Sequence, residues 1–403
     1  MKRELSRILF FGLFLAIVIG FNKTTEAQST VKVPGVTGTT VTVGGIFDLS
    51  GPLAATEAGH VQGLKDYIQM TNDKGGVNGR KIVLKLEDDQ WKTDKAIAAF
   101  RKLNEEGIFA LVGQVGSTQW TGLDPEIREE KIPVIGPGQT TKMQSDNAYC
   151  YNIMLAYSDM TALMVKQAVE KHKGSGKPKL ALFTPEGASS IEFAEGVKST
   201  AAKLGVPVVV NEMISYSASE MAGQVMKMKQ AQADAVIILA NITILTIYLR
   251  DAARLGASNI PVYSAYSSVK PVVWETAGKD ASSQNIGINP FAPIYEKGPG
   301  LEEMRSAVAK YNTSPSITGD LTYPHGWIAG KVFVEALKRT GKDLTREKFI
   351  KAIESIKNFD TGGVSGPINF GPGQRNGIKT ARWYSYDFSK KQLIPVSPWV
   401  TNK

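Results

Sequence analysis

Two hydrophobic spacings alternate along residues 41–142. Apolar residues recur at every second position in short β-branched runs, and at every third or fourth position in the segments between those runs. This pattern predicts strands over 41–46, 81–86, 109–112 and 132–135, and helices over 61–74, 93–106 and 123–130. Strands and helices that alternate at this spacing are typical of parallel βαβ units.

A second series with the same alternation begins after Tyr157. It predicts strands over 180–183, 206–210, 235–239 and 261–263, and helices over 192–204, 220–230 and 244–255. Three further helices are expected over 301–311, 327–339 and 347–356, and the glycine- and aromatic-rich end over 362–399 is expected to be irregular and β. A chain of 403 residues is long enough for two such α/β domains.

The loops after the first three predicted strands share one character. Residues 48–52, 87–90 and 113–118 are small, polar or rich in glycine. Loops at the carboxyl ends of parallel strands are where open α/β sheets bind small molecules. None of the three carries a recognisable nucleophile, metal cluster or phosphate loop, so the pattern predicts a site that holds a molecule without reacting with it.

The N-terminus has the pattern of a cleavable secretion signal. Basic residues Lys2, Arg3 and Arg7 precede an apolar run over 8–21 and a small residue, Ala27. The run is shorter than the roughly 20 residues that a membrane-spanning helix needs. We therefore expect a signal peptide over 1–27, and an exported, soluble, periplasmic mature protein. Cys150, the single cysteine, excludes an internal disulfide and lies too far from the signal to be a lipidated N-terminus.

Composition and motif spacing narrow the function classes. The formal net charge is +9, but no basic cluster is interleaved with aromatic residues, so we expect a solvated basic surface and no nucleic-acid partner. The histidines His60, His172 and His325 are too widely spaced to predict a zinc site, and Pro178 disqualifies the glycine-rich stretch before it as a phosphate loop. We predict no metal, no cofactor and no enzyme activity. Because catalytic groups need not be adjacent in sequence, turnover of a bound solute stays an alternative.

Several short motifs, in order, resemble a known family. They occupy residues 34–37, 49–52, 72–80, 113 with 117, and 327–337. Over about 33–399 the chain resembles the periplasmic type I solute-binding proteins of branched-chain amino acid ABC transporters, the leucine/isoleucine/valine-binding proteins. The resemblance implies two doubly wound parallel-sheet lobes that are joined by three crossing segments and close around a ligand. Mapped onto this chain, lobe 1 takes 30–154 and 289–368, and lobe 2 takes 155–288 and 369–403.

The resemblance also implies ligand-binding residues. In the amino-acid binders of this family, lobe 1 holds the ligand carboxylate, and the matching positions are Ser117, Gly138 and Thr140. Alternatively, Ser117 and Thr140 only cap helices. Further candidates beside predicted cleft loops are Ser50, Trp91, Trp120, Tyr151, Tyr157, Ser189 and His325. Each aromatic candidate is also open to interpretation as hinge packing or core, and His325 as a surface histidine.

Lobe 2 departs from the family pattern. The amino-acid binders place an aromatic and then an acidic residue there to meet the ligand ammonium, whereas this chain has Ser189 and Ile244 or Leu245. No acidic residue lies between Asp234 and Asp251, and a buried ammonium without a carboxylate partner is costly. A carboxylate ligand without a cationic group, such as an aromatic acid, therefore fits better. The carboxylates of Asp48, Asp89 and Glu186 are expected to be solvated loop groups or turn formers.

These observations predict the solute-binding component of an ABC importer. It is expected to act as a monomer that captures a small carboxylate-bearing solute and delivers it to ABC permease subunits in the membrane. A ligand-sensing periplasmic module that docks on a receptor kinase is the alternative, because both functions use the same lobe closure.

Overall fold

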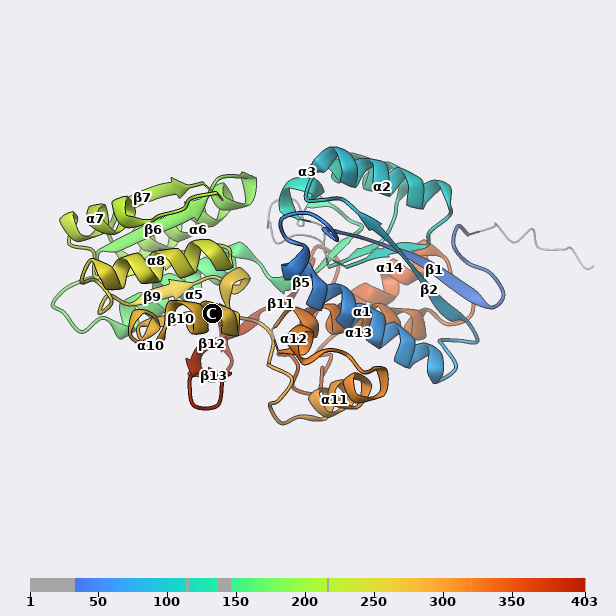
Figure 1. Cartoon of the computed structure of the whole chain (residues 1–403). Coiled ribbons are helices and arrows are strands. Elements are labelled where there is room, and N and C mark those ends of the chain that lie inside the picture. The colour runs from blue at the N-terminus through green and yellow to red at the C-terminus, as the bar shows by residue number, and fades with distance from the viewer. Residues whose placement is uncertain (1–32, 114–115, 137–145, 216, 320, 403) are drawn as a thin grey trace, which may run out of the picture. The chain divides into compact units, whose positions relative to one another are not determined.

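The computed structural model describes residues 33–113, 116–136, 146–215, 217–319 and 321–402. The expected signal peptide over 1–27 lies outside these ranges, and so do the predicted ligand residues Gly138 and Thr140. Residues 33–403 form one compact unit, and its strands gather in two sheets (Figure 1). Among the described residues, no helix combines the length and the apolarity that crossing a bilayer requires.

The first sheet is parallel throughout its described length. Its six strands lie in the order β11-β5-β4-β3-β1-β2. Their bounds are β1 Thr40–Phe47, β2 Lys81–Asp88, β3 Ala110–Val112, β4 Val134–Ile135, β5 Cys150–Leu155 and β11 Asn376–Ile378. The four predicted strands therefore form the expected parallel sheet, to which β5 and the late strand β11 are added without having been predicted.

The second sheet is mixed. Its main path runs β13-β12-β10-β9-β8-β6-β7, and β14 pairs with β12. The strands are β6 Leu180–Pro185, β7 Val208–Ile214, β8 Ala235–Ile238, β9 Val262–Ser264, β10 Asn285–Asn289, β12 Thr380–Asp387, β13 Gln392–Pro395 and β14 Val400–Thr401. β6 to β10 are parallel, whereas β12, β13 and β14 are antiparallel. The C-terminal segment thus extends a doubly wound sheet with antiparallel strands.

Helices cover both faces of each sheet, as a doubly wound fold requires. On the first sheet, α1, α11, α13 and α14 pack on one face, and α2 and α3 pack on the other (Figure 1). On the second sheet, α7, α8 and α9 pack on one face, and α5 and α6 pack on the other. The bounds are α1 Ala54–Asp73, α2 Thr93–Glu105, α3 Ser117–Glu130, α5 Tyr157–Lys171, α6 Ala188–Leu204, α7 Ala222–Gln230, α8 Ile242–Arg254, η1 Tyr266–Ser268, α9 Pro271–Ala277, α10 Lys279–Ser282, α11 Pro299–Tyr311, α12 Pro315–Thr318, α13 Thr322–Thr340 and α14 Arg346–Glu354.

Three segments join the half of the chain that contains the first sheet to the half that contains the second. The chain crosses between β5 and α5, again after β10, and finally at Lys379 between β11 and β12. The first two crossings lie where the expected lobe boundaries fall. The expected third boundary, at 368, comes before β11, which pairs with β5 of the first sheet. The lobe limits stay a prediction, because residues 33–403 form a single compact unit.

Four of the described helices begin several residues earlier than the hydrophobic pattern predicts. α1 begins at Ala54 instead of 61, and α13 begins at Thr322 instead of 327. α3 begins at Ser117 instead of 123, and α6 begins at Ala188 instead of 192. The first turns of α3 and α6 are mostly small and polar and hold one large apolar residue each, Trp120 and Ile191, which is too few for a periodicity argument to detect. Both early turns lie at the carboxyl ends of strands, so the difference concerns the part of the fold that matters for a ligand.

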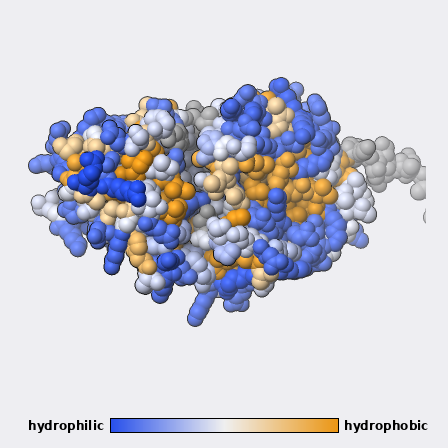
Figure 2. Space-filling view, viewed as in Figure 1, coloured by the Kyte–Doolittle hydropathy of each residue, from blue (hydrophilic) through white to orange (hydrophobic). Residues whose placement is uncertain are grey.

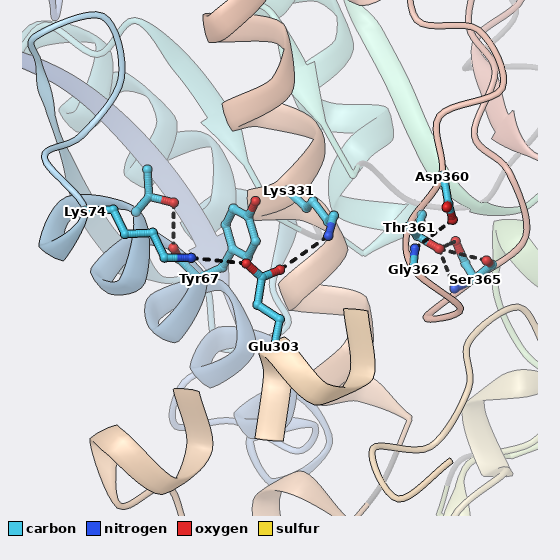
Figure 3. Close-up of polar contacts among 9 residues, drawn as sticks. Tyr67, Lys74, Glu303, Lys331, Asp360, Thr361, Gly362 and Ser365 are labelled. Atoms are coloured by element: carbon cyan, nitrogen blue, oxygen red, sulfur yellow. Dashed lines mark hydrogen bonds and ion pairs between the residues drawn. The ribbon is translucent and has the colours of Figure 1, made fainter. Parts of the chain in front are cut away.

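The closest helix contact in the first half joins α1 to α13. A Cβ added at Gly326 would lie 1.8 Å from the His60 carbonyl oxygen, and one added at Gly63 would lie 2.1 Å from the Tyr323 carbonyl oxygen. Only glycine permits backbones to approach this closely. Beside this contact, Glu303 of α11 bridges Lys74, just past α1, and Lys331 of α13 at 3.2 and 3.4 Å (Figure 3).

A tight turn over 360–365 closes the segment that leads toward β11. The Thr361 hydroxyl accepts from the Ser365 backbone N–H and donates to the Ser365 carbonyl oxygen, and the Asp360 carboxylate accepts from the Gly362 N–H (Figure 3). On the outside, hydrophilic residues cover much of the visible surface, with apolar areas over both halves of the molecule (Figure 2).

We predict that Gly326→Ala destabilises the protein because its new methyl group overlaps the His60 carbonyl oxygen. Overpacking of this kind costs about 1–3 kcal/mol of unfolding free energy. Urea denaturation measures the change. Gly223→Ala on α7 is the matched control, because a Cβ there meets nothing within 4 Å. Equal stabilities for Gly326→Ala and the unmodified protein would contradict the close helix contact.

Candidate functional site

A cavity opens where the carboxyl ends of the strands of both sheets converge. Its volume is about 1150 Å³, including space open to solvent. From the first half it is lined by the start of α1, the loop after β2, the start of α3 and the start of α13, and from the second half by the loops after β6, β8 and β9. These are the positions at which open α/β sheets bind ligands.

Ser117 lies at the cavity as the first residue of α3. The N-cap position before it is Gly116, and among the described residues no side chain caps this helix end. The Trp91 indole covers Gly116 so closely that an added Cβ would lie 2.4 Å from its Cη2 atom. The Ser117 hydroxyl and the first backbone N–H groups of α3 together form a hydrogen-bonding end that favours a negative charge.

Three carboxylates shape the loops around Trp91. Oxygen atoms of Asp48, Asp88 and Asp89 lie within 4.8 Å of one another. Asp48 accepts from the backbone N–H groups of Gly51 and Leu53 at 2.5 and 2.7 Å. Because these oxygens already accept backbone hydrogen bonds, we interpret the group as a loop-shaping cluster.

Asp88 and Asp89 hold an unusual turn. Asp89 accepts from the Trp91 N–H at 2.9 Å, and Asp88 accepts from the Gln90 N–H at 3.0 Å. Gln90 and Trp91 have φ of 48° and 57°, a left-handed conformation that is uncommon outside glycine. Burial, with the neighbouring charges of Asp48 and Asp88, raises the pKa of Asp89 to about 6. The expectation of solvated carboxylates is wrong for Asp48 and Asp89, which are each 1% exposed, whereas their turn-forming role is confirmed.

Two histidines meet at the contact between α1 and α13. The rings of His60 and His325 are in contact, with centroids 4.0 Å apart and an interplanar angle of 38°, and Phe47 and Phe291 flank them at 5.2 and 5.1 Å. Both histidines line the cavity. His325 is 3% exposed, so its interpretation as a surface histidine is wrong. Burial, followed by the neighbouring His60, lowers the pKa of His325 well below its usual value.

The second half contributes a different set of groups. Tyr157 begins α5, Ser189 lies in the first turn of α6, and Glu186 precedes that helix; all three line the cavity. Lys270 also lines it and is only 4% exposed, and its Nζ lies 3.5 Å from the Thr56 carbonyl oxygen at the start of α1. Among the described lining residues, Lys270 is the one lysine or arginine.

The structure brings together some of the residues expected at the site and places others elsewhere. Ser117, Trp91, Tyr157, Ser189 and His325 line the same cavity. Ser50 is exposed, and its hydroxyl donates to Asp88 at 2.5 Å. Gly138 and Thr140 lie outside the described residues.

Trp120 and Tyr151 are packed in the interior and do not line the cavity. Trp120 is 0% exposed in a cluster between α2 and α3. The Tyr151 hydroxyl accepts from Arg375 at 2.5 Å, and Arg375 pairs with Glu354 at 2.7 Å. Trp120 is therefore a core residue, and Tyr151 packs near a crossing segment. These are the alternatives that the sequence left open for the aromatic candidates. Ile244 and Leu245, which belong to α8, are likewise buried in the core.

Sequence reasoning missed Glu57, His60 and Lys270. Glu57 and His60 lie within the first two turns of α1, directly after the glycine-rich loop over 48–52, and Lys270 follows the loop after β9. The sequence feature that could have identified these residues is their position directly after the loops that follow predicted strands. Attention to loops alone excludes the first turns of helices, although those turns face the same space.

Comparison with known proteins gives a consistent result. A family model described as periplasmic binding protein matches residues 40–392. A Leu/Ile/Val-binding protein homolog 7 from Brucella suis is 24% identical over 375 residues, covering 89% of this chain and 91% of that protein. The Leu/Ile/Val-binding protein BraC3 from Rhizobium johnstonii is 24% identical and covers 82% of this chain and 87% of its own.

Solved structures share the fold. A fatty acid ABC transporter substrate-binding protein from Thermomonospora curvata superposes with a TM-score of 0.83 at 23% identity, covering 94% of this chain and 96% of its own. A branched chain amino acid ABC transporter protein from Thermus thermophilus with bound valine gives 0.81 at 20% identity, covering 91% and 97%. At these identities the likeness establishes the architecture alone.

We predict that Asp89→Asn changes the pH dependence of stability. The pKa of Asp89 in the folded protein, about 6, exceeds its unfolded value, so the native state binds the proton more tightly. Its contribution is therefore complete below about pH 4 and is lost as the pH rises through 6. Asparagine keeps an oxygen that accepts from Trp91 but cannot ionise. Unfolding free energies of Asp89→Asn should consequently decline less between pH 4.5 and 7.5 than those of the unmodified protein.

The exposed Asp280→Asn supplies the matched control for loss of one charge. It should keep the pH profile of the unmodified protein. An Asp89→Asn profile that is superimposable on that of the unmodified protein would show that Asp89 is ionised alike in both states.

Proposed function

The chain belongs to the periplasmic binding protein family, and from this we propose that it is the extracytoplasmic solute-binding component of an ABC importer. It captures a small carboxylate-bearing solute in the cavity between the two sheets and delivers it, as a monomer, to the permease subunits. The solute leaves chemically unchanged. The observation that carries the proposal is the cavity itself, which residues from strand ends of both sheets line together.

The names of relatives support a carboxylate-bearing solute. Curated relatives are described as Leu/Ile/Val-binding proteins, one solved relative holds valine, and another is described as a fatty acid transporter protein. Amino acids and fatty acids share a carboxylate and an apolar body. Ser117 at the start of α3 suits the carboxylate, and by resemblance Gly138 and Thr140 complete its binding.

The charges around the cavity favour a solute without an ammonium group. The second half presents a buried cation, Lys270, and it has no acidic residue between Asp234 and Asp251, where by resemblance the amino-acid binders of the family present an acid. Glu57 is a buried acid in the first half, but Lys270 Nζ reaches the carbonyl oxygen of the preceding residue, Thr56. A ligand ammonium near Glu57 would therefore meet a like charge, which is unfavourable in a site of low dielectric.

Aromatic side chains favour a planar or apolar ligand body. Trp91, Tyr157, Tyr266 and Phe291 all line the cavity, together with aliphatic residues such as Leu53. Aromatic faces pack well against other aromatic rings and against extended apolar chains. The ligand class that fits these surfaces best is an aromatic or branched carboxylic acid.

Thermal-shift measurements on matched acid pairs test this proposal. Leucine is compared with 4-methylpentanoate and phenylalanine with 3-phenylpropanoate, because the members of each pair differ only in the ammonium group. A ligand at 100 times its Kd adds about 2.7 kcal/mol to stability, so binding is detectable as a raised Tm. We expect the acids without the ammonium to give the larger shifts. Large shifts from leucine, isoleucine and valine alone would contradict the proposed ligand class.

A second prediction concerns Ser117. Ser117→Ala removes a hydrogen bond to a charged group and should weaken binding of the best acid by about 1–3 kcal/mol, on the order of 5- to 150-fold in Kd. Calorimetric titration measures the change. Ser306→Ala on α11 is the control, because Ser306 is exposed and bonds only its own helix. Unchanged affinity in Ser117→Ala would remove this residue from the carboxylate site.

A further inference from the structure

We propose that His325 forms a second polar subsite in the cavity, which hydrogen-bonds a hydroxyl group on the ligand. The preferred solutes are then hydroxy-substituted carboxylic acids. This inference rests on the proposed function, because it assumes that the cavity binds a carboxylate-bearing solute. It adds a specificity determinant at the contact between α1 and α13, on different elements from Ser117.

Packing fixes the His325 ring before any ligand arrives. Its imidazole lies against His60 with centroids 4.0 Å apart and the ring planes tilted by 38°, and it stacks on Phe291 with centroids 5.1 Å apart at an interplanar angle of 22°. Behind these rings, the glycine contact of α1 with α13 prevents either helix from moving apart without losing its packing. A ring held in this way presents its edge in one direction, and a preset hydrogen-bonding group costs little ordering entropy on binding.

One nitrogen of this ring lacks a partner. His325 is 3% exposed and lines the cavity, yet its Nε2 atom has no hydrogen-bond partner among the described residues. Buried polar atoms are normally hydrogen-bonded, and an exception at a cavity wall calls for an explanation. A ligand atom that reaches Nε2 from the cavity would supply the missing bond.

The charge state of His325 selects a neutral ligand group. Burial and the adjacent His60 keep its pKa well below the usual value, so the imidazole is uncharged at neutral pH. On the α1 side, His60 is in contact with the ring, and beyond it Glu57 Oε2 lies 3.8 Å from His60 Nδ1. A neutral imidazole cannot balance a carboxylate or an ammonium, but it has one donor and one acceptor nitrogen.

A hydroxyl group matches these properties. It donates and accepts, so it can pair with Nε2 in either tautomer of the ring. Metal ligation fits less well: among the described residues, the one set of three or more acidic, histidine or cysteine groups close enough to share an ion is Asp48, Asp88 and Asp89, and neither histidine belongs to it.

Calorimetric titration with acid pairs that differ by one hydroxyl group tests the proposal on the full mature chain. The probes are benzoate against its 2-, 3- and 4-hydroxy isomers, and 4-methylpentanoate against 2-hydroxy-4-methylpentanoate. We expect at least one hydroxy acid to bind about tenfold or more tightly than its parent, because a site that hydrogen-bonds a hydroxyl rejects the analogue that lacks it. Equal affinities within every pair would overturn the inference.

Variants then assign the preference to His325. His325→Phe should remove the preference for the hydroxy acid, so that the Kd values of the parent and hydroxy acids become equal within each pair. His325→Gln, whose amide can reach the position of Nε2, should restore part of the preference and serves if His325→Phe fails to fold. His172→Gln, far along the chain on the loop before β6, is the control and should behave as the unmodified protein.

The outcomes separate this inference from the proposed function. If the parent acids bind and no hydroxy acid is preferred, the carboxylate function stands and the His325 subsite is wrong. If the variants weaken both members of a pair equally, His325 supports the structure and does not read the hydroxyl, which also overturns the subsite. If no carboxylic acid binds at all, the proposed function itself falls, and this inference falls with it.

Discussion

The close contact between α1 and α13 is the constraint on which the first half of the molecule depends. Gly63 and Gly326 let two backbones approach to a distance at which no side chain fits. That approach puts His60 against His325 and lets Tyr323 and Thr313 both donate to the buried Asp66 at 2.7 and 2.6 Å. The same contact carries the start of both helices to the carboxyl edge of the sheet. The cavity wall is therefore a consequence of helix packing as much as of loop sequence.

The sequence predicted the architecture well because two spacings of apolar residues are enough to specify alternating strands and helices. β1, β2 and β6 occur where the alternation placed them, and the family resemblance supplied the three crossings. The site was predicted less completely. Trp91, Ser117 and Tyr157 follow strand ends and line the cavity, whereas Trp120 follows the same loop as Ser117 yet points into the core. The position of a residue along the chain predicts that it lies at the carboxyl edge of the sheet. Which side of a helix faces the cavity depends on packing, which the sequence pattern does not show.

The burial of two carboxylates at the carboxyl edge of the first sheet could not be predicted from the sequence alone. Asp48 and Asp89 resemble ordinary loop acids, and the structure buries both. Their burial is offset by backbone N–H donors, which is how buried carboxylates are normally accommodated. The loop that they shape holds Gln90 and Trp91 in a left-handed conformation. An exposed acid cannot stabilise such a turn as strongly, so burial of the acid and placement of Trp91 over Gly116 belong to the same arrangement.

Lys270 links the cavity to the movement that the family fold permits. It belongs to the second half but reaches the first residues of α1, so its ammonium lies where the two halves meet around the ligand. A buried cation is unfavourable unless negative or polar groups surround it. An anionic ligand adds such a group only when both halves contact it at once, and a ligand drives closure by the difference in its affinity for the two states. Under the proposed function, a carboxylate that contacts both Lys270 and Ser117 favours the closed arrangement, whereas a solute that lacks a negative charge gains nothing from that cation.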